Sequence, residues 1–334
     1  MIAKSTRFPF TSKKLPQIRA HRTKDDISSK PVLLVVVYRG GTYFKECVNS
    51  IKPCTQHFSS SIISINGSEP DEDLQTASQL SPLLKTTIFT TGHELTSINH
   101  FCLIRRQFLD LLNPAQHIFL LCHDDLLLYD SFRYLQPDDW LRADSSLSLG
   151  NYVVFRENGF VRNESAFRGN KSTHLTAKHA QWLDSLSNVH STYTNVSGMR
   201  MPSQVLSKAI KYQVRTRSEK GLRFEYICAA HNFIDVLYCY SPPLVAIREH
   251  SASEGANQTK LQYHGGEIRF MIWLFINCRS FHEIQKLLAS KFNLYYFFYN
   301  LSELVPLRYS GRRGGRIALV IGRFLQSLSI ALKP

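Results

Sequence analysis

Short apolar runs alternate with segments of helical periodicity in the first part of the chain. The runs are rich in Val, Ile, Phe and Leu, which is typical of strands buried on both faces of a sheet. They are 32-VLLVVV-37, 62-IISI-65, 87-TIFT-90 and 117-HIFLLC-122. Between them, two sets of residues lie on or near one helical face: Phe44, Cys47, Val48 and Ile51, then Ile98, Phe101, Cys102, Arg105 and Leu109. This alternation predicts βαβ units with a mainly parallel sheet and right-handed crossovers.

The pattern changes beyond residue 150. The run 151-NYVVF-155 predicts another strand, whereas 156–198 is polar, has little periodicity and is expected to be a long loop. Residues 222–247 predict a helical segment and a strand at 236–240, followed by Pro242-Pro243.

After about residue 265, apolar residues again recur at helical spacing, so helices are expected to the end of the chain. The segment 311–333 places an apolar stripe beside several Arg and Lys residues. Such a helix either packs on the core or lies in a membrane interface, where it attracts anionic lipid.

Polar residues follow the predicted strands where parallel strands leave a sheet. After the first strand, 40-GGT-42 predicts a turn with Thr42 as a helix N-cap, and 66-NGS-68 predicts a turn after the second. The triplet 123-HDD-125 follows the fourth strand. Ligands of open α/β sheets bind at the carboxyl ends of strands, and carboxylates there can share a divalent cation with phosphates. Aspartates at a strand end also serve as turn or cap residues, so a structural role stays open.

Composition narrows the class of protein. With 334 residues, 43% hydrophobic and 12% aromatic, the chain can bury a substantial core, which argues against disorder. The formal net charge of +14 favours nucleic acid, nucleotide phosphates or anionic lipid as neighbours. The seven cysteines form no CxxC pair and no zinc spacing, which indicates reduced thiols. No apolar run reaches the roughly 18–20 residues of a spanning helix, so we expect a soluble or peripheral protein.

In their order, the motifs resemble the GT-A glycosyltransferases of the large family 2 type, over about residues 32–252. Tyr38-Arg39-Gly40 is similar to the loop that ends the family's first strand, and Ile65-Asn66-Gly67-Ser68 to the turn that ends its second. His123-Asp124-Asp125 corresponds to the family's acidic triplet. Further on, 196-VSGMRMPSQVL-206 looks like a Gly-Met-x-x-Pro segment near the acceptor site, and 244-LVAIREHS-251 is similar to a Tyr-Arg-x-His element.

The resemblance implies an α/β fold of the GT-A (Rossmann-like) type, in which helices flank a mainly parallel sheet and a helical C-terminal extension follows. Residues 31–252 would form the GT-A domain, with a nucleotide-sugar-binding half at 31–150 and an acceptor half at 151–252. The basic segment 1–30 would be a flexible arm or an organellar transit peptide. Residues 253–334 would form a helical region able to associate with a membrane.

The resemblance also implies a set of site residues. The nucleotide-contacting residues would be Tyr38, Arg39, Asn66, Asp124 and Arg248. His123, Asp125 and His250 would hold Mn²⁺ or Mg²⁺. Glu225, in 223-RFEY-226, is the nearest match to the family's catalytic base, and Asp235 is the second candidate.

The implied function is metal-dependent, inverting transfer of a hexosyl or deoxyhexosyl group. The donor would be a nucleotide-diphosphate sugar and the acceptor a glycan or lipid-linked glycan, as in bacterial surface polysaccharide (O-antigen) assembly. The expected location is the cytoplasm or the inner face of the cell membrane.

Two departures from the family leave a different donor or a non-catalytic relative open. Ile65 stands where the family usually has an acid that contacts the base, and His123 replaces the first acid of the triplet. A nucleic-acid-binding protein is a further alternative, although the basic residues are dispersed rather than gathered on one module. A related nucleotidyltransferase would need a Gly-rich phosphate loop, of which 38-YRGG-41 is a faint version.

Overall fold

The computed structural model describes seven main stretches of the chain and several shorter ones. The main stretches are 30–67, 71–133, 146–156, 159–164, 173–176, 196–215 and 236–250. Shorter described pieces lie within 222–234 and 264–330. The statements below concern these residues.

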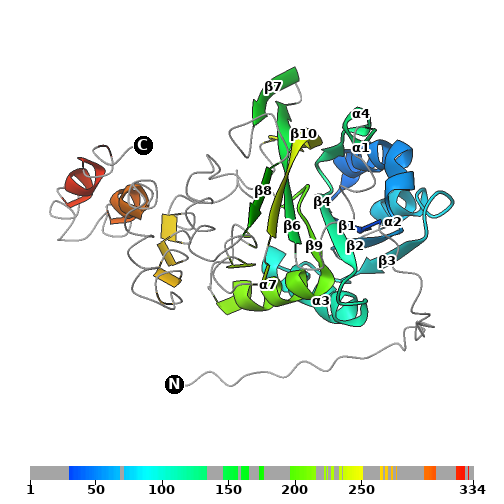
Figure 1. Ribbon diagram of the computed structural model, residues 1–334, viewed down its shortest axis with the longest axis horizontal. Helices are drawn as coiled ribbons and strands as arrows, with labels where there is room; N and C mark the ends of the chain where they lie inside the picture. Colours follow the sequence, from blue (N-terminus) through cyan, green and yellow to red (C-terminus); the bar gives the residue numbers. More distant parts are fainter. Residues whose placement is uncertain are drawn as a thin grey trace.

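The first half of the fold is the predicted series of strands and helices (Figure 1). Its strands are β1 (Val32–Tyr38), β2 (Ser60–Asn66), β3 (Thr86–Thr90) and β4 (His117–Cys122). Its helices are α1 (Gly41–Ile51), η1 (Lys52–His57), α2 (Asp71–Ser78), α3 (Ser97–Gln107) and η2 (Leu109–Leu111). The four strands pair in parallel in the order β3-β2-β1-β4. The prediction of a parallel α/β unit is therefore confirmed.

The second half adds mixed pairings to the same sheet. Its elements are β5 (Leu126–Leu127), α4 (Tyr129–Phe132), β6 (Ser146–Arg156), β7 (Gly159–Glu164), β8 (Thr173–Thr176), β9 (Arg200–Pro202), α7 (Ser203–Arg215) and β10 (Val236–Arg248). The sheet continues from β4 as β9-β6-β10-β5, while β7 pairs with β6 and β8 with β10. The long β6–β10 pair is parallel, and β9, β7, β8 and β5 are antiparallel to their neighbours.

The expectation of a long loop at 156–198 is wrong in part, because β7 and β8 form within it. Both strands mix polar and apolar residues, with the sequences GFVRNE and THLT. They pair at the sides of β6 and β10, where backbone hydrogen bonds supply the pairing. The strand predicted at 236–240 also continues through Pro242-Pro243, with a register shift between Tyr240 and Val245 that accommodates the two prolines.

Two hydrophobic clusters fill the two faces of the sheet. On one face, the odd-numbered residues Leu33, Val35 and Val37 of β1 pack in the cluster that contains α1 and α4. On the other, Val32 and Leu34 join the cluster that contains α3 and α7. β1 is thus buried on both sides, which explains its continuous apolar sequence.

The described C-terminal residues are helical, including 297–305 and 321–327, as the apolar spacing predicts. Ile321 and Phe324 are exposed, whereas Leu325 is buried. No helix among the described residues is both long and apolar enough to cross a membrane. The five cysteines whose side chains are described carry free thiols.

Candidate active site

The strand order changes direction between β1 and β4. From β1 the chain proceeds to β2 and β3 on one side, and then returns to place β4 on the other. This reversal of direction is a topological switch point, where α/β sheets bind ligands. The residues that follow β1 and β4 are the predicted Tyr38-Arg39 and His123-Asp124-Asp125.

Asp125 is buried, and both of its carboxylate oxygens accept hydrogen bonds from the protein. The Ser197 hydroxyl donates to Oδ2 over 2.5 Å, and the backbone N–H of Arg248 donates to Oδ1 over 3.0 Å. Burial raises the pKa of Asp125, as does the charge of Asp124, while the two hydrogen bonds oppose that shift. Asp125 therefore connects the turn after β4 to β10 and to the segment around Ser197.

Ser197 lies in the 196–206 segment that the sequence associates with an acceptor site. Its hydroxyl also accepts the backbone N–H of Cys122 over 2.8 Å. The next residue, Gly198, has φ +88 and donates its N–H to the carbonyl of Leu120. The segment thus packs along β4 and contributes directly to the position of the acids.

Asp124 faces a different set of partners. Its Oδ2 lies 3.1 Å from Nε2 of His250, whose ring centroid is 4.7 Å from that of Tyr43. The Nδ1 atom of His250 is buried and has no hydrogen-bond partner in the part of the chain that the structure describes. A ligand or cation that approaches this nitrogen would supply the partner it lacks.

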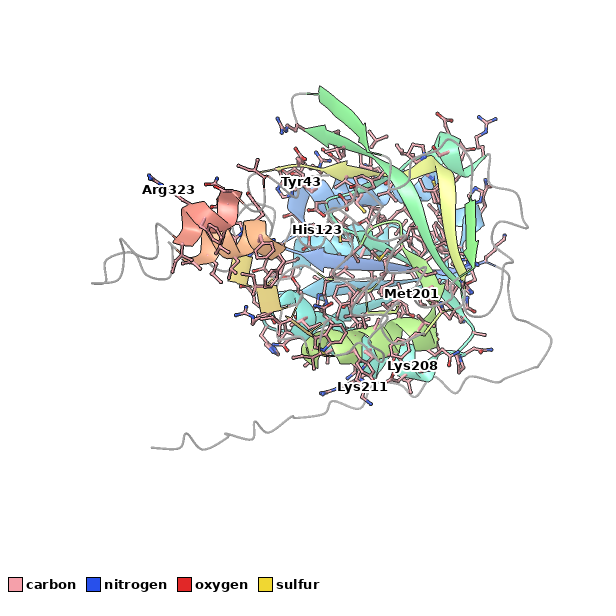
Figure 2. All side chains as sticks on the ribbon, turned by 60° about the vertical axis from the view of Figure 1, so that its left-hand side comes forward. Tyr43, His123, Met201, Lys208, Lys211 and Arg323 are labelled. Atoms are coloured by element: carbon pink, nitrogen blue, oxygen red, sulfur yellow. The ribbon has the colours of Figure 1, made fainter. Side chains whose placement is uncertain are left out.

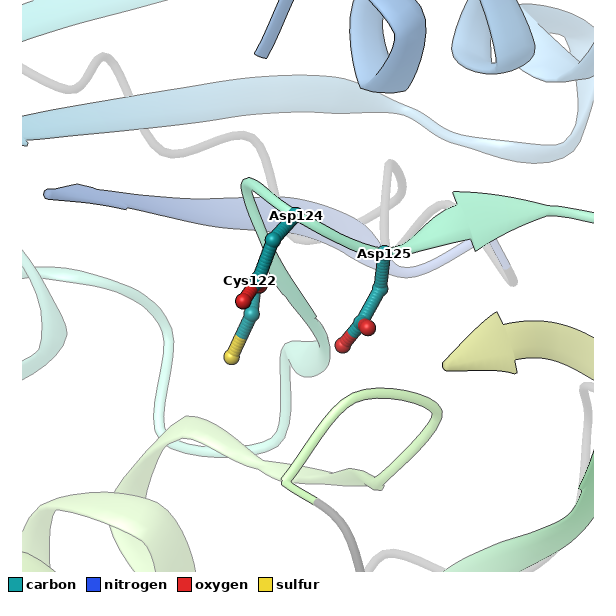
Figure 3. Close-up of side chains that lie close together, drawn as sticks. All are labelled: Cys122, Asp124 and Asp125. Atoms are coloured by element: carbon teal, nitrogen blue, oxygen red, sulfur yellow. The ribbon is translucent and has the colours of Figure 1, made fainter. Parts of the chain in front are cut away.

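The ligand atoms of Cys122, Asp124 and Asp125 lie within 4.8 Å of one another. Figure 3 shows the three side chains at the end of β4 and on the turn that follows. Because both oxygens of Asp125 already accept hydrogen bonds, the carboxylate of Asp124 is the better placed to bind a cation. The group offers carboxylate oxygens, which suit Mg²⁺ and Mn²⁺, and one thiol; His250 is not a member of it, although its Nε2 lies 3.1 Å from Asp124. The donor set therefore fits a divalent cation.

The side chain of His123 is partly buried. Its backbone N–H donates to the carbonyl of Val36 over 3.1 Å. Burial lowers the pKa of His123, and the charges of Asp124 and Asp73 only partly oppose this shift. Burial therefore favours the neutral form of His123. Figure 2 shows where Tyr43 and His123 lie relative to the rest of the side chains.

Arg248 is 7% exposed and has its guanidinium between two aromatic rings. Its Cζ lies 4.6 Å from the ring centroid of Tyr43 and 4.6 Å from that of Phe155. Nε donates to the Asp124 carbonyl over 3.1 Å, and Nη2 pairs with the carboxylate of Glu46, which is half exposed. The site thus holds a fixed positive charge beside the acids, which suits phosphate oxygens.

The N-terminus of α1 is capped by a residue that the sequence did not reveal. The N–H groups of Gly40 and Gly41 donate to the two carboxylate oxygens of Asp73, over 3.0 Å each. Thr42 was expected to be the N-cap, but the helix begins at Gly41 and the N-cap residue is Gly40, which has no side chain to accept a bond. Since Asp73 occupies these two amides, they cannot hold a phosphate as a Gly-rich loop would. This weighs against the nucleotidyltransferase alternative.

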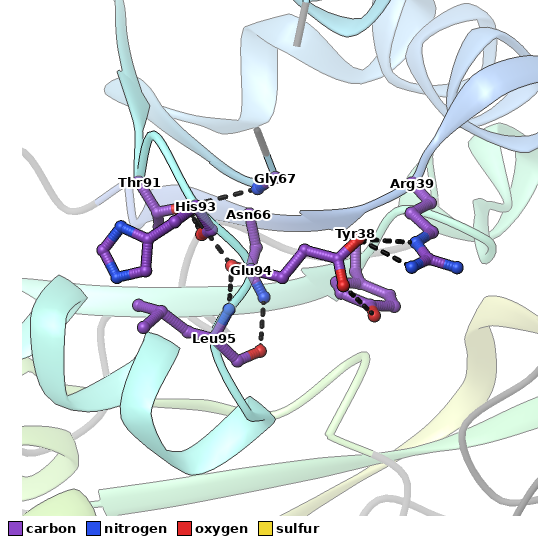
Figure 4. Close-up of polar contacts among 8 residues, drawn as sticks. All are labelled: Tyr38, Arg39, Asn66, Gly67, Thr91, His93, Glu94 and Leu95. Carbon is purple, nitrogen blue, oxygen red and sulfur yellow. Dashed lines mark hydrogen bonds and ion pairs between the residues drawn. The ribbon is translucent and has the colours of Figure 1, made fainter. Parts of the chain in front are cut away.

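A second group of polar residues surrounds the end of β1 on the β2 and β3 side (Figure 4). Asn66 is buried and forms two bonds with the backbone of Leu95, from Nδ2 to the carbonyl over 2.8 Å and from the N–H to Oδ1 over 2.9 Å. The side-chain amide of Asn66 therefore fixes the loop after β3. Glu94, on that loop, accepts two hydrogen bonds from Arg39 over 2.9 and 2.7 Å and one from the Tyr38 hydroxyl over 3.4 Å.

The structure gathers eight of the ten predicted site residues at this edge of the sheet. They are Tyr38, Arg39, Asn66, His123, Asp124, Asp125, Arg248 and His250. The two candidates for the catalytic base, Glu225 and Asp235, lie outside the described residues. Sequence reasoning missed Asp73, Glu94 and Glu46. Of these, only Glu94 has a local signal, since it follows a predicted strand at the carboxyl edge.

No protein-family model and no curated protein matches the chain. Among solved structures, S. aureus TarS matches 91% of this chain with a TM-score of 0.52 at 13% identity. The chain spans about half of that TarS chain, 49% of its length. S. aureus TarS 1-349 matches with a TM-score of 0.52 at 11% identity, covering 91% of this chain and 88% of TarS 1-349. The same fragment in complex with UDP gives 0.51 with the same identity and coverage.

At such identities the likeness concerns the fold. The α/β sheet, its flanking helices and the C-terminal helices agree with the expected architecture, and the match extends over nine-tenths of the chain. The protein has the GT-A fold and is a structural match to GT-A glycosyltransferases.

Proposed function

We propose that this protein is a glycosyltransferase that moves a sugar from a nucleotide-diphosphate donor to a glycan or lipid-linked glycan acceptor. The observation that carries the proposal is the arrangement of Asp124, His250 and Arg248 at the switch point of a GT-A sheet. It combines a carboxylate, an imidazole with an unpaired nitrogen and a fixed guanidinium at one place. The UDP complex of TarS makes a nucleoside diphosphate the natural donor fragment.

The roles follow from the contacts. Asp124 and His250, with Cys122 beside them, would hold Mn²⁺ or Mg²⁺, which when bound stabilises the negative charge of the departing diphosphate. Asp125 keeps the turn in place through Ser197 and the backbone of Arg248. The Arg248 guanidinium, paired with Glu46 and stacked between two rings, would add a fixed positive charge near the phosphates.

The remaining step is deprotonation of the acceptor hydroxyl. We assign it to Glu225, with Asp235 as the alternative, as the resemblance to the family implies. The hydroxyl then attacks the anomeric carbon directly, so a single displacement inverts the configuration. Attachment of the basic C-terminal helix to an anionic membrane surface belongs to the same proposal, because exposed Ile321 and Phe324 flank Arg323 there.

A thermal-shift titration tests the donor site. Purified protein is melted with UDP, GDP, CDP and dTDP, each with and without Mn²⁺, as wild type, Asp124→Asn and Asp130→Asn. Asp130 is the matched control, since its side chain is 90% exposed and lies on α4. A nucleotide at about 100 times its Kd stabilises by about 2.7 kcal/mol. We expect this gain to need Mn²⁺ and to disappear only in Asp124→Asn.

Two outcomes bear on the mechanism. Glu225→Gln should keep the donor-induced stabilisation and lose release of the nucleoside diphosphate in the presence of acceptor. Absence of stabilisation by every nucleotide, together with tight, salt-sensitive binding of RNA or DNA, would reject the transferase and favour the nucleic-acid-binding alternative.

A further inference from the structure

The helices that cover the two faces of the sheet differ in charge. On one face lie α3, η2 and α7, which contain five Arg or Lys residues and a single acid, Asp110. On the other face lie α1, η1, α2 and α4, which contain two lysines and five acids. Among these covering helices, the positive charge is therefore concentrated on the side of α3 and α7.

The exposed cations of this side have no acid to neutralise them. Lys208 and Lys211 are exposed one turn apart on α7, and Figure 2 labels both at the lower edge of the molecule. Arg106 is exposed at the end of α3, which packs against α7. Within the described chain none of the three forms an ion pair, and Asp110 instead lies 3.8 Å from Arg105. Their charges are thus available to an external anion.

Apolar side chains are exposed beside these cations. Leu111, in η2, is 71% exposed, and Val214, in the last turn of α7, is 48% exposed. The Ser207 hydroxyl donates to the carboxylate of Asp110, so η2 lies against α7. Val214 follows Ser207 by two helical turns and Lys211 by one, which places it on the same side of the helix. Exposed apolar groups next to lysines are typical of surfaces that lie in a membrane interface.

The combination favours lipid over other polyanions. Nucleic acid is bound by cations together with aromatic rings that stack on bases, and an exposed leucine contributes little there. An anionic lipid surface uses both kinds of side chain, because its phosphates attract lysine and its acyl boundary accepts apolar groups. We infer that the face formed by α3, η2 and α7 binds an anionic lipid surface, with the cations at the headgroups and Leu111 and Val214 inserted between them.

The charge difference across the sheet also determines the orientation. A negatively charged surface attracts the α3–α7 face and repels the acidic helices α1, α2 and α4 on the opposite face, so only one side of the protein docks. The inference goes beyond the proposed function, and it concerns a surface separate from the C-terminal helix.

Flotation of the full chain with lipid vesicles tests the inference. Vesicles of phosphatidylcholine alone are compared with vesicles of equal parts phosphatidylcholine and phosphatidylglycerol, at low and at high salt. The variants are the double substitution Lys208→Gln/Lys211→Gln and the single substitution Leu111→Asn. Binding of a single-stranded RNA is measured on the same proteins.

Each variant has a control that makes the same chemical change elsewhere. Lys45→Gln/Lys85→Gln also removes two exposed lysine charges, one on α1 and one just before β3. Leu83→Asn replaces a leucine that is 52% exposed, in the turn after α2. None of these residues belongs to the α3–α7 face. Thermal melting without vesicles verifies that every variant is folded.

We expect wild type to bind the anionic vesicles far better than the neutral ones, and more weakly as salt is added. Each lysine near an anionic surface contributes about fivefold to binding, so Lys208→Gln/Lys211→Gln should bind about 30-fold more weakly. Leu111→Asn should bind about tenfold more weakly, because asparagine does not enter the apolar boundary. The controls should bind nearly as wild type does.

Unchanged vesicle binding by Lys208→Gln/Lys211→Gln would overturn the inference and assign any attachment to the C-terminal helix. An equal loss in this variant and in its charge control would also overturn it, since the effect would then be one of net charge. RNA binding that falls in the double variant while vesicle binding does not would replace lipid by nucleic acid. These outcomes leave the donor site untouched, because the thermal-shift titration with nucleotides measures it separately.

Discussion

The buried carboxylate of Asp125 gives the most direct test of the site's construction. Asp125→Ala removes the acceptor of the Ser197 hydroxyl and of the Arg248 backbone N–H. A buried donor left without a partner costs about 1–3 kcal/mol, so the two together cost about 2–6 kcal/mol. Burial raises the pKa of Asp125, which means that its charge is itself unfavourable in this environment, and removal of the charge offsets part of the loss. We expect a net destabilisation of about 2–4 kcal/mol.

Urea unfolding followed by circular dichroism measures this change as a free energy, and thermal melting gives a second estimate. At roughly 2–4 °C per kcal/mol for a domain of this size, the melting temperature should fall by about 5–15 °C. Asp125→Asn is the matched control. Its amide oxygen can still accept the Arg248 N–H and its NH₂ group can donate to the Ser197 oxygen, so it should lie within about 1 kcal/mol of wild type.

Asp124→Ala provides the contrast within the same turn. Asp124 forms one side-chain bond, to His250, where Asp125 forms two, so its removal should cost about 1–3 kcal/mol and less than Asp125→Ala. If Asp125→Ala melts within about 2 °C of wild type, or if Asp124→Ala is the more destabilising of the two, the assignment of Asp125 as the structural acid is refuted.

Three further predictions concern the framework of the site. Burial lowers the pKa of His100 to about 4. The contribution of the neutral imidazole to stability is therefore complete above pH ~6.5 and is lost as the pH falls through 4. In urea unfolding, wild type should lose about 3 kcal/mol more than His100→Gln between pH 7 and 4. A Cβ at Gly40 would lie 2.5 Å from Cβ of Phe44, so Gly40→Ala should destabilise by about 1–3 kcal/mol, whereas Gly67→Ala, with no atom within 4 Å, should change thermal stability little. Arg248→Lys keeps the charge but loses the planar stacking between two rings and one of two side-chain hydrogen bonds, and should cost about 1–3 kcal/mol in urea unfolding; a change below 0.5 kcal/mol would contradict the stacked geometry.

The parallel half of the sheet was predictable from sequence because of where its strands lie. β1 and β4 are covered by helices on both faces, so all but their end positions are apolar and the run stands out against the flanking helices. β7 and β8 carry polar residues instead, and they are strands because neighbouring backbone pairs with them. No local pattern encodes the pairing of β8, since its partner β10 lies far along the chain. For β7, which directly follows β6, the dipeptide 158-NG-159 is a hairpin signal that the sequence analysis did not use.

The positions of Asp73 and Glu94 show a second limit of sequence reasoning. Asp73 caps α1 from a position more than thirty residues along the chain, so the bond depends on how α2 packs beside α1. Asn66 bonds to Leu95 and so holds the loop after β3, from which Glu94 reaches Arg39. The resemblance implies that Asn66 contacts the nucleotide, and its amide bonds to the backbone of Leu95.

The paired acids themselves illustrate why a motif can be recognised before its members are given roles. Asp124 and Asp125 are adjacent, and the turn after β4 directs their side chains to different surroundings. Which of them stays available to a ligand depends on Ser197 and on the backbone of Arg248, which bond to both oxygens of Asp125 and leave Asp124 beside His250. Ser197 and Arg248 lie more than seventy residues further along the chain, and they meet Asp125 only in the folded sheet. Asp125 thus connects the two halves of the sheet, and the carboxylate of Asp124 remains available to a ligand.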